Sequence, residues 1–202
     1  MPDPAEARRH QAKMAKKKTA RDKILAAKTE ERGLVIVHTG KGKGKSTAAW
    51  GMALRAIGHG MRVGVVQFVK GKWDTGERAV LERFGEHCVI EAHGEGFSWE
   101  SQDLERDREA ARRAWNAALA MMADPGFALI VLDEINIALR YGQLELETVL
   151  HGLEARSEGQ HVVLTGRNAP DALIEAADLV TEMTLVKHPF RSGVKAQAGI
   201  EF

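Results

Sequence analysis

A glycine- and lysine-rich segment at residues 39–47 has the residue types and spacing that hold a nucleotide phosphate. It contains Thr-Gly-Lys-Gly-Lys-Gly-Lys-Ser-Thr, follows a short apolar run and precedes a helical pattern. Gly40, Gly42 and Gly44 permit backbone conformations in which successive N–H groups converge on phosphate oxygens, and the following helix directs its positive end at them. The segment therefore predicts a phosphate-binding loop (P-loop). This strand–loop–helix setting disfavours the alternative, a lysine-rich surface turn.

The side chains of this loop predict what it holds. Lys45 would neutralise phosphate charge, and the Ser46 hydroxyl would ligate Mg²⁺. We expect the other polar residues of the loop, Lys41, Lys43 and Thr47, to complete the binding set for a nucleoside triphosphate. ATP is the expected nucleotide.

Two adjacent carboxylates supply the second half of the predicted site. The apolar run 129–132 ends in Asp133 and Glu134. A strand that ends in acids is a weak signal alone, but together with a P-loop it is the usual partner that holds Mg²⁺ directly or through water. We expect Glu134 to be the metal-side acid, with Asp133 as the alternative.

Six short apolar runs must position these groups. Most are continuous Val/Ile/Leu runs, as expected for strands that are buried on both faces of a parallel sheet. The expected strands are 34–37, 63–69, 88–92, 129–132, 161–165 and 179–185. The expected helices between them are 46–58, 77–84, 103–122, 145–156 and 170–176. The fold class is therefore α/β, a P-loop NTPase-type (RecA-like), mostly parallel six-stranded sheet with helices on both faces.

The charge distribution separates a basic head, residues 1–32, from the P-loop domain at 33–202. The head has ten Lys or Arg against five Asp or Glu, about +5, and the remainder has nineteen against twenty-three, about −4. Its composition predicts an exposed helix over 3–31. A solubilising tail and a helix that docks on a partner subunit or over a ligand are both open. Such a charge suits nucleic acid, a membrane surface or an anionic small molecule.

Composition places the chain among ordinary globular proteins. At 202 residues, 44% hydrophobic and 28% charged, it is neither fibrous nor wholly disordered. The single cysteine, Cys88, lies in an apolar run and is expected to be a core residue without chemistry. The sequence shows no secretory signal and no membrane span, so we expect a cytoplasmic protein.

Seven sequence blocks in order resemble the P-loop corrinoid adenosyltransferases, the ATP:cob(I)alamin adenosyltransferases. The resemblance covers residues 33–202. The standard P-loop spacing would place the first glycine at position 39, which is Thr39 here, and the first glycine comes one residue later, at Gly40. This shift also resembles that family's loop. The family commonly has a smaller polar residue where this chain has Lys41 and a threonine where it has Ser46. The blocks are 39–47, 55–60, 67–71 with 76–77, 96–100, 133–134, 165–167 and 193–197.

This resemblance implies a reaction that the residues alone do not define. Cobalt(I) of a corrinoid would attack C5′ of ATP, form a cobalt–carbon bond and expel triphosphate, with no protein nucleophile. Lys45, the loop amides and Mg²⁺ would stabilise charge on the leaving triphosphate. The family holds ATP reversed in the loop relative to hydrolases, which nothing in the residues alone reveals.

The resemblance also assigns residues outside the loop. Phe97 and Trp99 match an aromatic pair near the corrin that displaces the lower axial ligand and makes cobalt easier to reduce. Ordinary core packing is the alternative for this pair. Arg55 and Arg167 are expected to bind the nucleotide. Helix packing is the alternative for Arg55, and contact with the corrin carboxamides or a solvated basic patch is the alternative for Arg167. Three basic residues near the end of the chain would line the ligand or form a solvated patch: Lys187, His188 and Lys195.

The implied substrates are ATP and a corrinoid, and the implied protein partner is an electron-donating flavoprotein reductase. A second copy of the chain would form a homodimer in which the basic head of one subunit covers the site of the other. The corrinoid is left open between cob(I)alamin and cob(I)yrinic acid a,c-diamide. The rival function is a P-loop ATPase or small-molecule kinase, which would release ADP. A nucleic-acid-binding ATPase ranks last, since the chain shows no recognisable nucleic-acid module.

Overall fold

The computed structural model describes residues 4–69, 75–94 and 103–201. The chain divides into two compact units, residues 1–32 and residues 33–202. The first unit is built on one helix, α1 (Pro4–Ala26), whose described side chains are all exposed. The composition predicted such a helix, because its large apolar residues, Met14, Ile24 and Leu25, are too few to bury a face.

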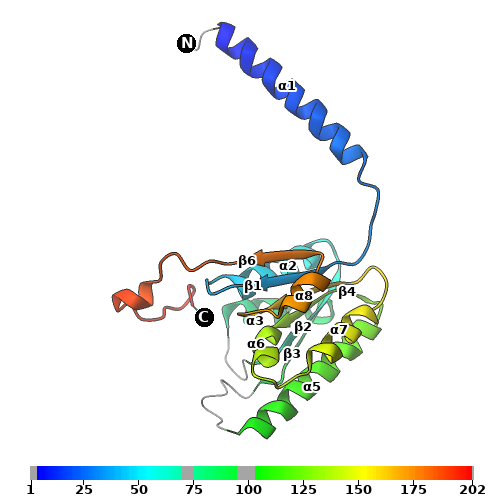
Figure 1. Ribbon diagram of the computed structural model, residues 1–202, viewed down its shortest axis with the longest axis vertical. Helices are drawn as coiled ribbons and strands as arrows, with labels where there is room; N and C mark the ends of the chain where they lie inside the picture. Colours follow the sequence, from blue (N-terminus) through cyan, green and yellow to red (C-terminus); the bar gives the residue numbers. More distant parts are fainter. Residues whose placement is uncertain (1–3, 70–74, 95–102, 202) are drawn as a thin grey trace. The chain divides into compact units, whose positions relative to one another are not determined.

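The second unit is built on a six-stranded sheet in which every pair of neighbours is parallel. The order across the sheet is β3-β2-β4-β5-β1-β6 (Figure 1). This confirms the predicted fold class. The strands are β1 (Val35–Thr39), β2 (Arg62–Gln67), β3 (Cys88–Ala92), β4 (Phe127–Asp133), β5 (His161–Thr165) and β6 (Leu179–Glu182).

Helices cover both faces of the sheet, because successive residues of the central strands point to opposite faces and nearly all are apolar. One buried cluster joins one face to α2 (Lys45–Gly58) and α3 (Gly76–Leu81). A second cluster joins the other face to four more helices. These are α5 (Leu104–Ala123), α6 (Ile135–Arg140), α7 (Leu146–Glu154) and α8 (Asp171–Ala176).

Most predicted elements form, with ends that differ by a few residues. The helix predicted at 77–84 is α3 followed by a 3-10 helix, η1 (Glu82–His87), in which Gly85 has a φ of 56°. The last strand ends at Glu182, short of the predicted residue 185, because its partner β1 ends at Thr39, where the loop begins. The sequence analysis missed α6, which has six residues and is too short to show a helical period. Near the end of the chain lies a second 3-10 helix, η2 (Pro189–Ser192).

The sheet brings the ends of four strands to one edge. Gln67 at the end of β2 is in register with Asp133 at the end of β4, and His38 of β1 is in register with Thr165 at the end of β5. In open parallel sheets, ligands bind at this carboxyl edge. Within the ranges that the structure covers, no helix is long and apolar enough to cross a membrane.

Candidate active site

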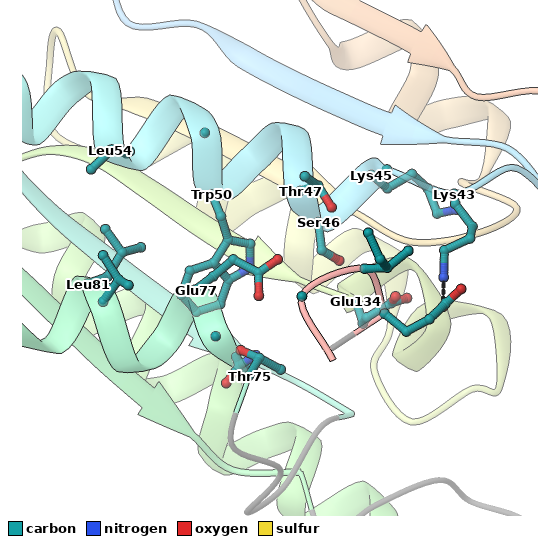
Figure 2. A pocket seen from close by; sticks show the side chains of 18 of the residues that line it. Lys43, Lys45, Ser46, Thr47, Trp50, Leu54, Thr75, Glu77, Leu81 and Glu134 are labelled. Carbon is teal, nitrogen blue, oxygen red and sulfur yellow. Dashed lines mark hydrogen bonds and ion pairs between the residues drawn. The ribbon is translucent and has the colours of Figure 1, made fainter. Parts of the chain in front are cut away.

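A cavity of about 650 Å³ lies at the carboxyl edge of the sheet and includes the predicted P-loop (Figure 2). Such a volume suits a nucleotide-sized ligand. Its walls come from the loop, α2, the ends of β2 and β4, the segment after β5, α3 and the tail of the chain. The lining residues are Gly42 to Thr47, Trp50, Gly51, Leu54, Gln67, Thr75, Gly76, Glu77, Val80, Leu81, Glu134, Arg167, Gly199, Ile200 and Glu201.

Two properties of the structure require glycine in the loop: a left-handed backbone conformation and close packing against a neighbouring segment. Gly40 and Gly44 have φ values of 95° and 101°, in the left-handed region that favours glycine. A Cβ on Gly40 or Gly42 would lie 2.5 or 2.7 Å from the carbonyl oxygen of Met183. The Gly42 N–H donates a hydrogen bond to that same oxygen at 2.6 Å. The segment after β6 therefore supports the loop, which the sequence did not indicate.

The N-terminus of α2 opens directly onto the cavity. Gly44 is the N-cap residue, and among the described residues no side chain caps the first turn. Ser46 and Thr47, in that first turn, line the cavity. Since the first N–H groups of a helix have no intrahelical partner and lie at its positive end, this turn is suited to an anion.

Lys45 is buried beside several charges. Its side chain is 6% exposed, and its Nζ donates a hydrogen bond to the carbonyl oxygen of Gly42 at 2.6 Å. Burial lowers the pKa of Lys45 below its ordinary value of 10.5, Glu134 acts against that shift, and Arg167 and Lys43 lower the pKa further. Three cationic side chains thus share this end of the cavity with two carboxylates, those of Glu134 and Glu201.

The two carboxylates after β4 have different surroundings. Asp133 is 1% exposed and accepts hydrogen bonds from Thr165 Oγ1 at 2.8 Å and from Gln67 Nε2 at 3.4 Å. Glu134 has a φ of 63° and its side chain lines the cavity, while its backbone N–H donates to Thr165 Oγ1 at 2.9 Å. The left-handed backbone at Glu134 separates a buried acid from one that reaches the ligand space. This geometry favours Glu134 over Asp133 as a ligand for a cation.

The remaining predicted residues fall into three groups. Arg167, which follows β5, lines the cavity with the loop. Gly40, Lys41 and Arg55 are not among the lining residues, and the side chains of Lys41 and Arg55 are exposed. The aromatic pair, Phe97 and Trp99, lies outside the described residues, and its place near a corrin stays a prediction. Lys187, His188 and Lys195 also do not line the cavity.

The sequence analysis missed several lining residues. Trp50 is only 4% exposed, yet it is part of the cavity wall. Gln67 is 2% exposed and ends β2 after a run of apolar residues and one glycine, and that polar residue at a strand end was the available signal. The tail residues Gly199 to Glu201 gave no local signal, because they reach the loop only through the tertiary fold.

Comparison with known proteins gave consistent matches over both units. Residues 31–202 match the family described as ATP:corrinoid adenosyltransferase BtuR/CobO/CobP. Residues 1–25 match the family described as Cob(I)alamin adenosyltransferase N terminal.

Named relatives match over nearly their whole length. The chain is 53% identical over 199 residues to the corrinoid adenosyltransferase of Pseudomonas aeruginosa, covering 98% of each chain. It is 57% identical over 196 residues to that of Sinorhizobium sp, covering 96% of this chain and 92% of the relative. It is 46% identical over 194 residues to that of Salmonella typhimurium, covering 96% and 98%.

A solved structure supports the fold. The flagellar accessory protein FlaH from Methanocaldococcus jannaschii superposes with a TM-score of 0.50 at 9% identity. The match covers 75% of this chain and 71% of that one. At this identity the likeness bears on the arrangement of helices and strands alone.

Proposed function

The chain belongs to the ATP:corrinoid adenosyltransferase family, and we propose that the cavity at its P-loop is where the 5′-deoxyadenosyl group passes from ATP to a corrinoid. The protein is therefore a transferase that uses ATP and a corrinoid as substrates. The alternative of an ATPase or small-molecule kinase is not favoured, since the relatives that match nearly the whole chain are corrinoid adenosyltransferases.

One observation carries the placement of the reaction: the P-loop, Glu134 and Arg167 line a single cavity. In the reaction, cobalt(I) donates an electron pair to C5′ of ATP, and the bond between C5′ and its phosphate oxygen breaks. The electrons of that bond leave with the triphosphate. The protein must therefore stabilise negative charge that develops on the leaving oxygen.

The cationic end of the cavity suits this task. Lys45 is held by its hydrogen bond to the Gly42 carbonyl, beside the first turn of α2. Because the lysine is buried, its charge acts through less water than a surface charge does. We propose that Lys45, Arg167 and Lys43 bind the triphosphate, and that the N–H groups of Ser46 and Thr47 complete the cradle.

The donor set also fits Mg²⁺. The Ser46 hydroxyl and the Glu134 carboxylate line the same cavity and are hard oxygen ligands. In the described ranges, no three His, Cys, Asp or Glu residues cluster, as a cage built wholly from protein ligands would require. Mg²⁺ keeps several waters and needs few protein ligands, so this sparse set is appropriate. When bound, the ion would neutralise charge on the phosphate oxygens.

Four further parts of the proposal rest on the family resemblance. Phe97 and Trp99 would form the aromatic wall against the corrin. A flavoprotein reductase would supply the electron, and the cytoplasm would be the compartment. Two chains would form a homodimer in which the basic helix α1 of one covers the site of the other. The match of residues 1–25 to an adenosyltransferase N-terminal family supports a role for that helix in the activity.

The test is an anaerobic reaction of the full chain with ATP, Mg²⁺ and chemically reduced cob(I)alamin or cob(I)yrinic acid a,c-diamide, in separate arms. We expect a light-sensitive alkyl-corrinoid and an equal amount of triphosphate, with both lost in Lys45→Ala. The arm with the faster turnover would identify the substrate. Release of ADP and phosphate with an unchanged corrin spectrum would contradict the proposal.

A further inference from the structure

Two buried polar residues, Thr165 and Asn136, lie behind the charged end of the cavity. Thr165 is the last residue of β5, and Asn136 lies in the first turn of α6. Both side chains are fully buried, and neither is among the residues that line the cavity. Each is joined by a hydrogen bond to a segment that carries a charged lining residue, Glu134 or Arg167. We call this pair, Thr165 and Asn136, the strand-end clamp.

The hydroxyl of Thr165 bridges the two carboxylate residues at the end of β4. Since Leu132 and Leu164 are in register, the next residues, Asp133 and Thr165, are neighbours at the edge of the sheet. The Glu134 N–H donates to Thr165 Oγ1 at 2.9 Å, and Thr165 Oγ1 donates to Asp133 Oδ1 at 2.8 Å. A backbone N–H can only donate, so the single hydroxyl hydrogen is directed at Asp133. One hydroxyl therefore holds both the backbone of Glu134 and the carboxylate of Asp133.

The backbone of Glu134 needs such a partner. Its φ of 63° is in the left-handed region, which is unfavourable for a residue with a Cβ. If β4 continued through Glu134, its side chain would point to the face of the sheet opposite that of Asp133. The left-handed turn ends the strand, and the side chain lines the cavity. Since strained backbone persists only where its surroundings hold it, the hydrogen bond to Thr165 helps to fix the direction of the Glu134 carboxylate.

Arg167 lies on a segment with the same kind of backbone. Gly166 before it has a φ of 131°, and Asn168 after it has a φ of 54°. In the described part of the chain, Asn168 and Glu134 are the two non-glycine residues with a positive φ. The Gly166 N–H donates to the carbonyl oxygen of His38 at 3.2 Å, which anchors one side of the segment to β1. Each strained turn therefore carries a charged residue of the cavity wall.

Asn136 anchors the other side of that segment. Its Nδ2 donates to the Gly166 carbonyl oxygen at 3.1 Å, and a Cβ on Gly166 would lie 2.8 Å from the Asn136 Cβ. A carbonyl can only accept, so the amide nitrogen faces Gly166 and Oδ1 is directed elsewhere. This Oδ1 has no hydrogen-bond partner among the described residues. A buried acceptor without a partner is unfavourable, so stability alone does not explain an asparagine at this position.

We propose that the strand-end clamp sets the direction of the two charged side chains: Thr165 is the positioning residue for Glu134, and Asn136 is the positioning residue for Arg167. This rests on the proposed function, in which Glu134 binds Mg²⁺ and Arg167 binds the triphosphate. Thr165 therefore acts on the affinity for the cation, and Asn136 acts on the affinity for the anion. Neither residue touches the ligand.

The test for Thr165 is the Mg²⁺ dependence of inorganic triphosphate binding to the full chain, measured by calorimetry without corrinoid. Thr165→Val keeps the shape of the side chain and removes its hydroxyl. We expect it to raise the Mg²⁺ concentration for half-maximal enhancement of binding by about tenfold. Thr165→Ser keeps the hydroxyl and should stay within about twofold of the wild type.

Val163→Ala is the matched control for stability. Val163 is fully buried in the same strand, two residues before Thr165, and its truncation leaves a cavity without changing the strand end. We expect Val163→Ala to lower Tm and to leave the Mg²⁺ dependence unchanged. The same shift of Mg²⁺ dependence in Val163→Ala would mean that Thr165 only stabilises the fold, and would overturn its assignment.

The test for Asn136 sets stability against binding. Asn136→Leu has a similar volume and no donor. We expect it to weaken triphosphate binding about threefold to tenfold at saturating Mg²⁺, while Tm stays close to that of the wild type because the unpaired Oδ1 is also removed. In an Arg167→Gln background the same change should have no further effect on binding, because it acts through that arginine.

Three results would overturn the strand-end clamp: an unchanged Mg²⁺ dependence in Thr165→Val, a lower Tm with unchanged triphosphate binding in Asn136→Leu, or losses that add in the double variant. Failure of the proposed function would look different. The wild type would then transfer no adenosyl group, and Glu134→Gln and Arg167→Gln would themselves leave Mg²⁺ and triphosphate binding unchanged.

Discussion

The Glu201 carboxylate forms an ion pair with Lys43 of the P-loop. The tail thus reaches across to the loop, and Gly199, Ile200 and Glu201 line the cavity. The hydrogen bond from Lys43 holds the pKa of Glu201 below its ordinary value, because the ion pair favours the ionised carboxylate. A triphosphate bound at the loop, as proposed, would therefore compete with the carboxylate of Glu201 for the same cation.

We expect Glu201→Gln to bind inorganic triphosphate more tightly, by about twofold to fivefold, because a competing charge is removed from Lys43. Calorimetric titration at low and high salt measures this, and the gain should shrink as salt screens the charges. Glu175→Gln, an exposed change on α8 away from the cavity, is the control. Weaker binding in Glu201→Gln would mean that the tail supports the ligand.

Lys45 and Lys41 belong to the same loop, but substituting them should change the rate of adenosyl transfer by different amounts. Lys45 is buried and lines the cavity, whereas Lys41 is exposed and does not line it. We expect Lys45→Met to reduce the rate of adenosyl transfer by about a hundredfold or more, as loss of a transition-state charge does. Lys41→Met should change it by less than about threefold. Single-turnover formation of alkyl-corrinoid measures both, and equal losses would refute the distinction.

Substitutions of the two carboxylates after β4 should have different effects, one on metal binding and the other on the stability of the fold. We expect Glu134→Gln to raise the Mg²⁺ concentration for half-maximal activity by about tenfold with little change in Tm. Asp133→Asn should lower the free energy of unfolding by about 1–3 kcal/mol, because Asp133 is buried between two hydrogen-bond donors. Denaturant unfolding and a Mg²⁺ titration of each variant check this. The reverse pattern would assign the metal to Asp133.

The shifted pKa of Lys45 gives a direction for pH dependence. Burial lowers this pKa, so in the free protein the lysine loses its proton at a lower pH than an ordinary lysine. Triphosphate binding needs the charged form and should weaken as pH rises through the lowered pKa.

The stability of the folded protein should change with pH in the direction opposite to triphosphate binding. Between the lowered folded pKa and the unfolded pKa near 10.5, the unfolded chain binds more protons at Lys45, so stability rises with pH there relative to Lys45→Met. Titrations from pH 7 to 10 in parallel with Lys45→Arg, which stays charged, isolate this group. The same fall in triphosphate affinity in Lys45→Arg would remove Lys45 as its cause.

Cys88 should be unreactive in the native protein. Burial, with a smaller effect of Glu82, raises the pKa of its thiol to about 11 from 9.0, and the side chain is 6% exposed. At pH 8 the thiolate fraction is then about a hundredfold smaller than in the unfolded chain. Reaction with a thiol reagent before and after unfolding in denaturant measures the ratio. Fast native labelling would show that β3 opens readily.

The sequence predicted the parts of the site that are contiguous in the chain. Lys45 and Ser46 follow Gly44 directly, so one segment carries both the backbone and the side chains of the predicted phosphate-binding loop. The continuous apolar runs likewise predicted buried parallel strands, and therefore the sheet and the edge where the site lies. The resemblance of seven blocks indicated the family, which the comparisons confirm.

Two parts of the cavity could not be predicted, because they depend on backbone geometry or on distant contacts. The sequence gives no reason for the left-handed φ of Glu134, which separates its carboxylate from that of Asp133. Gln67 and Glu201 lie 134 positions apart, yet they line one cavity. No local pattern indicates that Glu201 lies beside Lys43.

The sequence by itself therefore determined the fold class and the family and predicted a phosphate-binding loop, since local spacing and hydrophobic pattern encode them. Only the tertiary structure decided which residues line the cavity at this loop. The order β3-β2-β4-β5-β1-β6 places the end of β2 and helix α3 beside a loop that follows β1. That order results from how the whole chain buries its strands, and no short segment specifies it.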